Sequence, residues 1–332
     1  PFEGAIEANV GSFMCSYNRV NGHYSCENPE TLQRDLKDVL GFKGWVMSDW
    51  GATHSLSLGA GLDQEMPANT SFGAAAVRDA INAGNVSIER VDEAVSRILT
   101  PFFAVGAFDA PNPNSVQNNA ATAAHTELAR ELAARSIVLL KNDGDVLPLA
   151  VPAAGLTVAC IGNASKSPIV AGGGSGHVIP AYVSAPFDAI RDKLGIAAEE
   201  CNSNATRCCS ADVCLLYSDG GSDARAVATK ATAAPVFGPT SSHEAADRAS
   251  LKLDGDADAL IAAVATYNPR TVACIVAPGA VLTPWRKTVA AATLGFMPGQ
   301  QYGNALADVL FGDVAPSAKL PLTLPSEGQE PL

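Results

Sequence analysis

One stretch decides how the first part of the chain folds: Gly44-Trp45-Val46-Met47-Ser48-Asp49-Trp50-Gly51. A short apolar run ends abruptly in a carboxylate, a large aromatic ring and a glycine. Such a run is typical of a buried parallel strand, and α/β enzymes carry their chemistry just past the carboxyl ends of these strands. Asp49 is therefore a candidate catalytic residue, with Trp50 beside it.

An acid and an indole at one strand end suit a site that handles a sugar. The carboxylate of Asp49 can attack or stabilise an anomeric carbon. The flat ring of Trp50 can lie against the apolar face of a pyranose. The alternatives are structural: Asp49 can cap a following helix, and Trp50 can belong to the core.

Composition and charge exclude several classes of protein. The chain has 332 residues, of which 47% are hydrophobic and 17% charged, so we expect a globular protein with room for two domains. The net charge of −12 argues against nucleic acid and anionic membrane surfaces as partners. No apolar run reaches the roughly 20 residues of a membrane-spanning helix.

Strands and helices alternate through most of the chain, with one interruption. Residues 109–122 lack apolar periodicity and are predicted to be a linker between domains at 1–108 and 123–332. The second domain is predicted to be α/β with a mainly parallel sheet. In the first domain we expect strands at 10–17 and 44–48 and helices at 29–40, 72–83 and after Ser87. In the second we expect strands at 136–140, 156–162, 213–217 and 271–277 and helices at 123–135, 257–266 and 303–310.

Eight cysteines fall into three groups. Cys15 and Cys26 bracket a short polar loop and can form a disulfide. The four cysteines between 201 and 214 can supply one or two more, since a zinc site there lacks paired Cys-x-x-Cys spacing and a nearby histidine. Cys160 and Cys274 lie in apolar runs and are expected to be buried thiols. The loop cysteines, with four glycosylation sequons, indicate a secreted protein.

No cofactor or metal is expected from the remaining motifs. The glycine-rich run at 172–176 lacks the Lys-Ser/Thr ending of a phosphate-binding loop and is predicted to be a tight loop. The acids at 254–258 imitate a calcium loop, but Ala259 and Ala265 occupy its sixth and twelfth positions. Asp63 is expected to be structural, and Asp247 is expected to pair with Arg248.

Sugar hydrolysis requires a second carboxylate. One acid of a common glycosidase attacks as an ionised group, and the other stays protonated until it donates its proton. Glu244 is the candidate, in the loop sequence Ser241-Ser242-His243-Glu244-Ala245-Ala246-Asp247-Arg248, because such a loop can reach over a site. The alternative is a loop glutamate that is merely solvated.

Motifs along nearly the whole chain carry a resemblance to a known family. They lie at 14–22, 44–51, 60–67, 136–149, 172–176, 244–248, 298–300 and 307–321. In this order they resemble glycoside hydrolase family 3, and its β-glucosidase branch most closely. The resemblance implies an α/β protein in which residues 1–108 are the C-terminal part of a (β/α)8 TIM barrel. Residues 123–332 would then be an α/β sandwich domain with a mainly parallel sheet that carries the acid/base loop.

The resemblance also implies roles for four residues. Asp49 would be the nucleophile of a retaining mechanism, and Glu244 the acid/base lent by the second domain. The hydroxyl of Tyr17 would face the nucleophile, and Trp50 would stand beside the sugar. The implied activity is exo-acting release of glucose from the non-reducing ends of β-glucosides, without metal.

Members of the family begin their barrel upstream of the position matched by residue 1, and that part grips the sugar hydroxyls. A barrel cannot close without its first strands. Either a separate polypeptide supplies these strands, or the chain is an incomplete fragment that binds carbohydrate or has a structural role. A related exo-glucanase or xylosidase is a further alternative.

Overall fold

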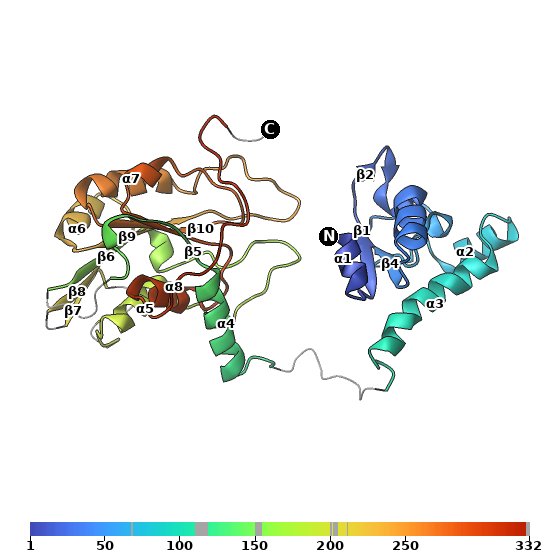
Figure 1. Cartoon of the computed structure of the whole chain (residues 1–332), viewed down its shortest axis with the longest axis horizontal. Coiled ribbons are helices and arrows are strands. Elements are labelled where there is room, and N and C mark those ends of the chain that lie inside the picture. The colour runs from blue at the N-terminus through green and yellow to red at the C-terminus, as the bar shows by residue number, and fades with distance from the viewer. Residues whose placement is uncertain are drawn as a thin grey trace. The chain divides into compact units, whose positions relative to one another are not determined.

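The structure is a computed structural model that describes residues 1–67, 69–109, 119–149, 155–199, 201, 205–210 and 212–329. It divides into two compact units, residues 1–118 and 119–332. Figure 1 shows the elements of each unit. Most of the predicted linker at 109–122 lies outside the described residues. No helix among the described residues is long and apolar enough to cross a membrane.

The first unit is built around two parallel strands. Its elements are α1 (Phe2–Glu7), β1 (Ser12–Cys15), β2 (Arg19–Val20), β3 (His23–Tyr24), η1 (Ser25–Glu27), η2 (Glu30–Val39), β4 (Trp45–Ser48), η3 (Ser57–Ala60), α2 (Ala74–Asn82) and α3 (Ile88–Ala104). Strand β1 runs parallel to β4 with Cys15 opposite Ser48, and Gln64 forms a parallel bridge with Met47. The predicted strand at 44–48 is confirmed. The segments that follow β1 and β4 therefore reach the same edge.

The helices of this unit follow their sequence signals. The predicted helix at 29–40 is η2, which is wound more widely than an α-helix, since the Leu40 N–H donates to the carbonyl of Asp35. Leu32 is buried and Leu36 packs against the same core cluster. Ser87 caps α3, because its Oγ accepts the Arg90 N–H at 3.2 Å. Helix η2 therefore buries part of its apolar face, whereas in α3 only Ala94 is buried and Val95 and Leu99 stay exposed.

A buried ion cluster ties these elements together. The Lys37 ammonium lies 2.8 Å from both oxygens of Asp63, and both side chains are fully buried. Arg90 contacts Asp63 Oδ1 at 2.6 Å, and the Val46 N–H donates to Oδ2 at 2.8 Å. Burial lowers the pKa of Lys37 to about 8, so the ammonium still faces the carboxylate at neutral pH. Asp63 is structural as predicted, but Lys37 and Arg90 are partners that the sequence did not reveal.

The second unit is a three-layer α/β fold. Its helices are α4 (Ala123–Ser136), η4 (Asp143–Asp145), η5 (Asn163–Ser165), α5 (Pro186–Lys193), α6 (Ala224–Lys230), α7 (Ala257–Tyr267), η6 (Pro284–Lys287) and α8 (Tyr302–Phe311). Its strands are β5 (Val138–Asn142), β6 (Thr157–Ile161), β7 (Arg207–Ser210), β8 (Val213–Ser218), β9 (Ala234–Pro239), β10 (Thr271–Val276) and β11 (Ala291–Gly295). The fold class predicted for this half, α/β with a mainly parallel sheet, is confirmed.

The seven strands lie in the order β5-β11-β10-β9-β6-β8-β7. The five inner strands are parallel, and each edge strand, β5 and β7, runs antiparallel to its neighbour. Helices α4, α5 and α8 cover one face, where Phe187 and Tyr302 are buried. Helices α6 and α7 cover the other, where Ile261 and Trp285 are buried (Figure 1). Both faces are covered, as the near-continuous apolar strands require.

Six cysteines form disulfides, and the two in β6 and β10 stay free. Disulfides join Cys15 to Cys26, and, in the second group, Cys201 to Cys208 and Cys209 to Cys214. Cys160 and Cys274 are free and buried, and burial raises the pKa of Cys274 to about 12. The sulfurs of the second group are all taken up in disulfides, so they offer no thiolate for zinc.

Asp308 on α8 joins three helices of the second unit. Its carboxylate accepts two hydrogen bonds from Arg130 on α4, at 2.6 and 2.7 Å, and Lys193 at the end of α5 lies 2.7 Å away. Burial opposes ionisation of Asp308, but the bonds from Arg130 and Lys193 outweigh it and hold its pKa below the ordinary value. The ionised form therefore stabilises the folded unit.

We expect Asp308→Asn to lower the free energy of unfolding by about 2 kcal/mol at pH 7, because it removes charge-assisted hydrogen bonds. The folded-state pKa lies below the unfolded value of about 3.9, so this stabilisation is present above pH ~4 and lost as the pH falls through the folded pKa. Urea unfolding at pH 7 and pH 3 measures it. Asp192→Asn, at a side chain that is 62% exposed, is the matched control and should change little. An equal deficit at both pH values would contradict the assignment.

Candidate active site

Asp49 lies at the carboxyl end of β4, held by its backbone and by two neighbours. Its N–H donates to the carbonyl of Cys15 at 3.1 Å, which ties it to the end of β1. Its Oδ1 accepts the Tyr17 hydroxyl at 2.9 Å and the Trp50 N–H at 2.7 Å. The carboxylate is thus oriented by two hydrogen-bond donors and by its own backbone.

A sharp turn follows Asp49. The Ala52 N–H donates to the Asp49 carbonyl at 3.0 Å, and the Gly51 N–H donates to the Met66 carbonyl at 3.0 Å. Gly51 has a φ of +81°, which favours glycine. The indole that precedes it stays open, because Trp50 is 49% exposed. Trp50 is therefore not part of the core of its unit, contrary to the structural alternative.

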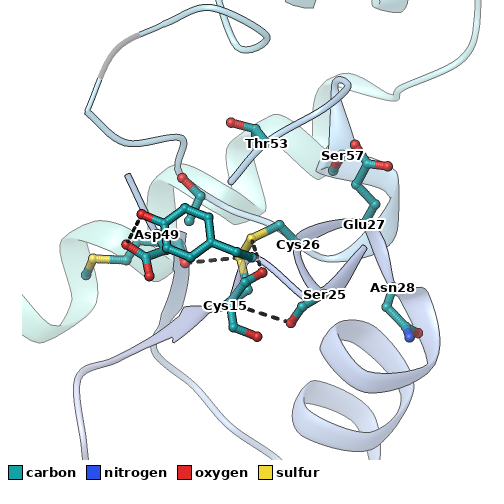
Figure 2. Close-up of a disulfide and its surroundings, with 12 residues drawn as sticks. Cys15, Ser25, Cys26, Glu27, Asn28, Asp49, Thr53 and Ser57 are labelled. Carbon is teal, nitrogen blue, oxygen red and sulfur yellow. Dashed lines mark hydrogen bonds between the residues drawn. A yellow bond between two sulfur atoms is a disulfide. The ribbon is translucent and has the colours of Figure 1, made fainter. Parts of the chain in front are cut away.

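Tyr17 is placed by a cross-linked loop. The Cys15–Cys26 disulfide lies directly beside Asp49 in Figure 2. The Ser16 N–H donates to Ser25 Oγ at 3.3 Å, which adds a second tie between the same two segments. The Tyr17 hydroxyl also donates toward the carbonyl of Trp50 at 2.9 Å. The loop thus brings the phenol and the carboxylate together, as the resemblance implies.

A second acid near this edge has a different character. Glu65 accepts hydrogen bonds from the Thr53 hydroxyl at 2.8 Å and from the backbone N–H groups of Ser71 and Phe72 at 2.9 and 2.8 Å. Partial burial opposes its ionisation, but these donors outweigh it and hold the pKa of Glu65 below the ordinary value. The carboxylate of Glu65 is therefore taken up by hydrogen bonds that hold the segment after β4 in place.

Glu244 lies in the second unit, on the loop that follows β9. The side chain is exposed, and its Oε2 accepts the Ser175 N–H at 2.7 Å. The Glu244 N–H donates to the Gly173 carbonyl at 3.3 Å. The bond from Ser175 holds the pKa of Glu244 below its usual range. The glycine-rich run is thus a tight loop whose observed partner is the Glu244 segment.

The predicted ion pair next to Glu244 is wrong. Within the described part of the chain no salt bridge joins Asp247 to Arg248. Arg248 instead donates from Nη2 to the carbonyl of Ala280, and its Nη1 is buried without a hydrogen-bond partner. Adjacent residues often point apart along a loop, and here the backbone carbonyl is the nearer acceptor. Arg248 therefore anchors the loop to the β10 side of the sheet.

Among the described residues, no group of three or more His, Cys, Asp or Glu side chains is placed to hold a metal ion. The candidate catalytic groups are two carboxylates, those of Asp49 and Glu244. One sits at the end of β4 beside a phenol and an open indole, and the other sits on a loop beyond β9.

Comparison with known families shows to which family the chain belongs. The model of the glycosyl hydrolase family 3 C-terminal domain matches residues 137–331, and that of the family 3 N-terminal domain matches residues 1–100. The chain belongs to glycosyl hydrolase family 3. The match to both models covers the segments that carry Asp49 and Glu244.

Named relatives of this family 3 chain are β-glucosidases. "Probable beta-glucosidase L" of Emericella nidulans is 37% identical over 98% of this chain and 48% of its own length. The β-D-glucoside glucohydrolase of Trichoderma reesei has 33% identity and a TM-score of 0.85, covering 98% of this chain and 48% of that one. DesR, a β-glucosidase from Streptomyces venezuelae solved with D-glucose, has 28% identity and a TM-score of 0.83 over 98% of this chain and 56% of that one. The chain thus spans about half the length of these relatives.

Proposed function

We propose that this family 3 chain carries the two catalytic carboxylates of a retaining, exo-acting β-glucosidase. The observation that carries the proposal is the carboxylate of Asp49, oriented by Tyr17 at a strand end beside an open indole. Asp49 attacks the anomeric carbon while the bond to the leaving oxygen breaks, and Glu244 gives that oxygen its proton. Glu244 then takes a proton from the water that releases glucose from the aspartyl ester.

In this mechanism Tyr17 positions the carboxylate of Asp49, and Trp50 binds the sugar. The Tyr17 hydroxyl donates to Asp49, so it stabilises the carboxylate before attack and when glucose leaves. The exposed ring of Trp50 provides an apolar wall on which a pyranose face can stack. β-Glucosides are the proposed substrates, as the names of the relatives suggest for those proteins.

For the first unit we propose the last strands of a (β/α)8 barrel. Parallel pairing of β1 with β4, and the parallel bridge from Met47 to Gln64, support this arrangement. So do large apolar side chains left exposed on this unit, which further barrel strands on the same or another polypeptide would cover. They include Phe2, Met14, Val39, Phe103 and Val105. The three disulfides of the described residues support a secreted protein.

A mechanism-based label tests the proposal. An aryl 2-deoxy-2-fluoro-β-glucoside with a good leaving group forms the aspartyl ester, and the fluorine slows its hydrolysis by destabilising the positively charged transition state. We expect a glucosyl label on the peptide that contains Asp49, found by peptide mass spectrometry. Asp49→Asn should remain unlabelled, and a label on another carboxylate would sink the assignment.

A carbohydrate-binding or structural chain is the second candidate. It is favoured by the open indole of Trp50, which can stack on a sugar face without any hydrolysis. Glucose binding by calorimetry without hydrolysis of any aryl β-glucoside, by a chain whose second unit is folded, would support it over catalysis.

A further inference from the structure

Two loops meet around Glu244, and they leave neighbouring strands. The loop after β6 carries residues 172–175, and the loop after β9 carries residues 242–244. From β6 the chain continues through α5 and the edge strand β7 to β8, which lies on one side of β6, whereas from β9 it continues through α7 to β10, in the opposite direction across the sheet (Figure 1). Strands β6 and β9 are paired at Ile161 and Val236, so their carboxyl ends frame a topological switch point. Open α/β sheets place functional loops at such a point.

The two loops are joined by a short ladder of hydrogen bonds. The Gly173 N–H donates to the Ser242 carbonyl at 2.9 Å, and the Glu244 N–H donates back to the Gly173 carbonyl at 3.3 Å. Gly173 and His243 form a parallel bridge. Two residues after Gly173, the Ser175 N–H donates to Oε2 of the Glu244 side chain at 2.7 Å. The ladder therefore fixes the Glu244 backbone and its side chain together.

Glycine is required where the run touches His243 and Glu244. Gly174 has a φ of +102°, and a Cβ there would clash with Glu244 Cβ and lie 2.8 Å from its Oε2. A Cβ on Gly173 would clash with the His243 ring. Gly176, two residues further on, has no atom within 4 Å of an added Cβ and no positive φ. The closest approach is thus the contact with the 243–244 segment, and a Cβ on Gly172 would lie less tightly, at 3.3 Å, against Ser242 Oγ.

We propose that residues 173–175 form a positioning clamp for Glu244, and that the Ser175 N–H selects which carboxyl oxygen exchanges the proton. This inference rests on the proposed acid/base role of Glu244. A backbone N–H only donates, so Oε2 accepts its bond in both charge states of the carboxyl group. The proton therefore sits on Oε1. It passes from there to the leaving oxygen as the glycosidic bond breaks, and returns to Oε1 from the attacking water.

The clamp also sets the balance between the two charge states. The Ser175 N–H and hydroxyl, with a smaller contribution from His243, hold the pKa of Glu244 below its usual range. His177, next to the glycine-rich run, bonds the Gly172 carbonyl through Nδ1 at 2.9 Å, and Asp247 and Arg248 are further charged groups on the loop after β9. A clamped Glu244 therefore favours the base step, and substrate must raise its pKa for the acid step.

The first test needs no hydrolysis. In the full chain labelled with ¹³C at glutamate carboxyls, the Glu244 signal is identified by its loss in Glu244→Gln and then titrated. We expect Gly174→Ala to raise the pKa of Glu244 toward the ordinary value of about 4.3, and Gly176→Ala to leave it unchanged. Ser175→Pro, which lacks the N–H, should raise it as well if Gly174→Ala folds poorly. An unchanged pKa in every folded clamp variant would overturn the clamp.

The second test separates positioning from general damage. For aryl β-glucosides with poor leaving groups, Gly174→Ala should lower kcat/KM by about 10–100-fold, since general acid catalysis contributes on the order of 10²–10⁴. 2,4-Dinitrophenolate leaves without taking up a proton, so for 2,4-dinitrophenyl β-glucoside Gly174→Ala should change kcat/KM of the first step little. Gly176→Ala should change kcat/KM little on both substrates. Equal losses on both substrates would overturn the clamp. If the unaltered chain hydrolyses neither substrate, the proposed function fails, while the titration still decides whether the clamp exists.

Discussion

Replacing Asp49 with alanine is expected to lower hydrolysis of an aryl β-glucoside by on the order of 10⁴-fold or more in any preparation of this chain that is active. The covalent step then has no nucleophile, and the Tyr17 hydroxyl loses its acceptor at 2.9 Å. Initial rates with a chromogenic glucoside measure the loss. Asp38→Ala is the matched control, because that carboxylate lies on η2 and bonds Gln33.

The product formed with added azide separates the two carboxylates. In Asp49→Ala, azide can enter from the face that the carboxylate vacates, so one inversion should give the α-glucosyl azide. In Glu244→Ala the ester on Asp49 still forms from an activated glucoside, and azide attack on it should give the β-glucosyl azide after two inversions. NMR of the products reads the anomer. The same anomer from both variants would contradict the division of roles.

The first unit shows what local sequence reveals about a site. An apolar run ending in Asp49 correctly predicts the buried strand β4, whose carboxyl end lies beside that of β1. The contact between Tyr17 and Asp49 joins residues 32 positions apart, and the family resemblance rather than spacing anticipated it. Residue type and strand position thus indicate the acid, but its partner depends on how two strands pair.

The sheet shows where composition misleads. Strands β9, with the sequence Ala-Pro-Val-Phe-Gly-Pro, and β11, with Ala-Ala-Thr-Leu-Gly, are fully or almost fully buried, yet neither was predicted. Proline and glycine are depleted in strands, and alanine carries little strand preference, so the local pattern resembles a loop. Each of them lies between two paired strands, β9 between β10 and β6 and β11 between β10 and β5, and pairing on both sides overrides the local preference.

The contact between residues 173–175 and Glu244 could not be predicted from the local sequence for the same reason. Ser175 and Glu244 are 69 residues apart, and their contact exists because β6 and β9 are neighbours in the sheet. A glycine-rich run predicts that its backbone closely approaches another part of the structure, but it does not indicate which part.

Replacing Asp63 with alanine is expected to destabilise the first unit by about 3–5 kcal/mol. The Lys37 ammonium would remain fully buried without its counter-charge, and the Val46 N–H would lose its acceptor. Hydrogen exchange by mass spectrometry measures this in peptides from η2, β4 and α3. Peptides from the second unit provide an internal reference, because Asp63 has no part in that core.

Two further variants distinguish charge pairing from cavity formation as the cause of the lost stability. Adding Lys37→Met to Asp63→Ala removes the unpaired ammonium and should restore part of the stability, since a buried charge costs more than the apolar group that replaces it. Glu30→Ala breaks an ion pair with Arg34 whose side chains are about 60% exposed, and should change stability by less than about 1 kcal/mol. No recovery in the double variant would refute the electrostatic account. Because Asp63 Oδ2 holds the backbone of β4 at Val46, three residues before Asp49, loss of this cluster should also loosen the strand end on which the proposed nucleophile stands.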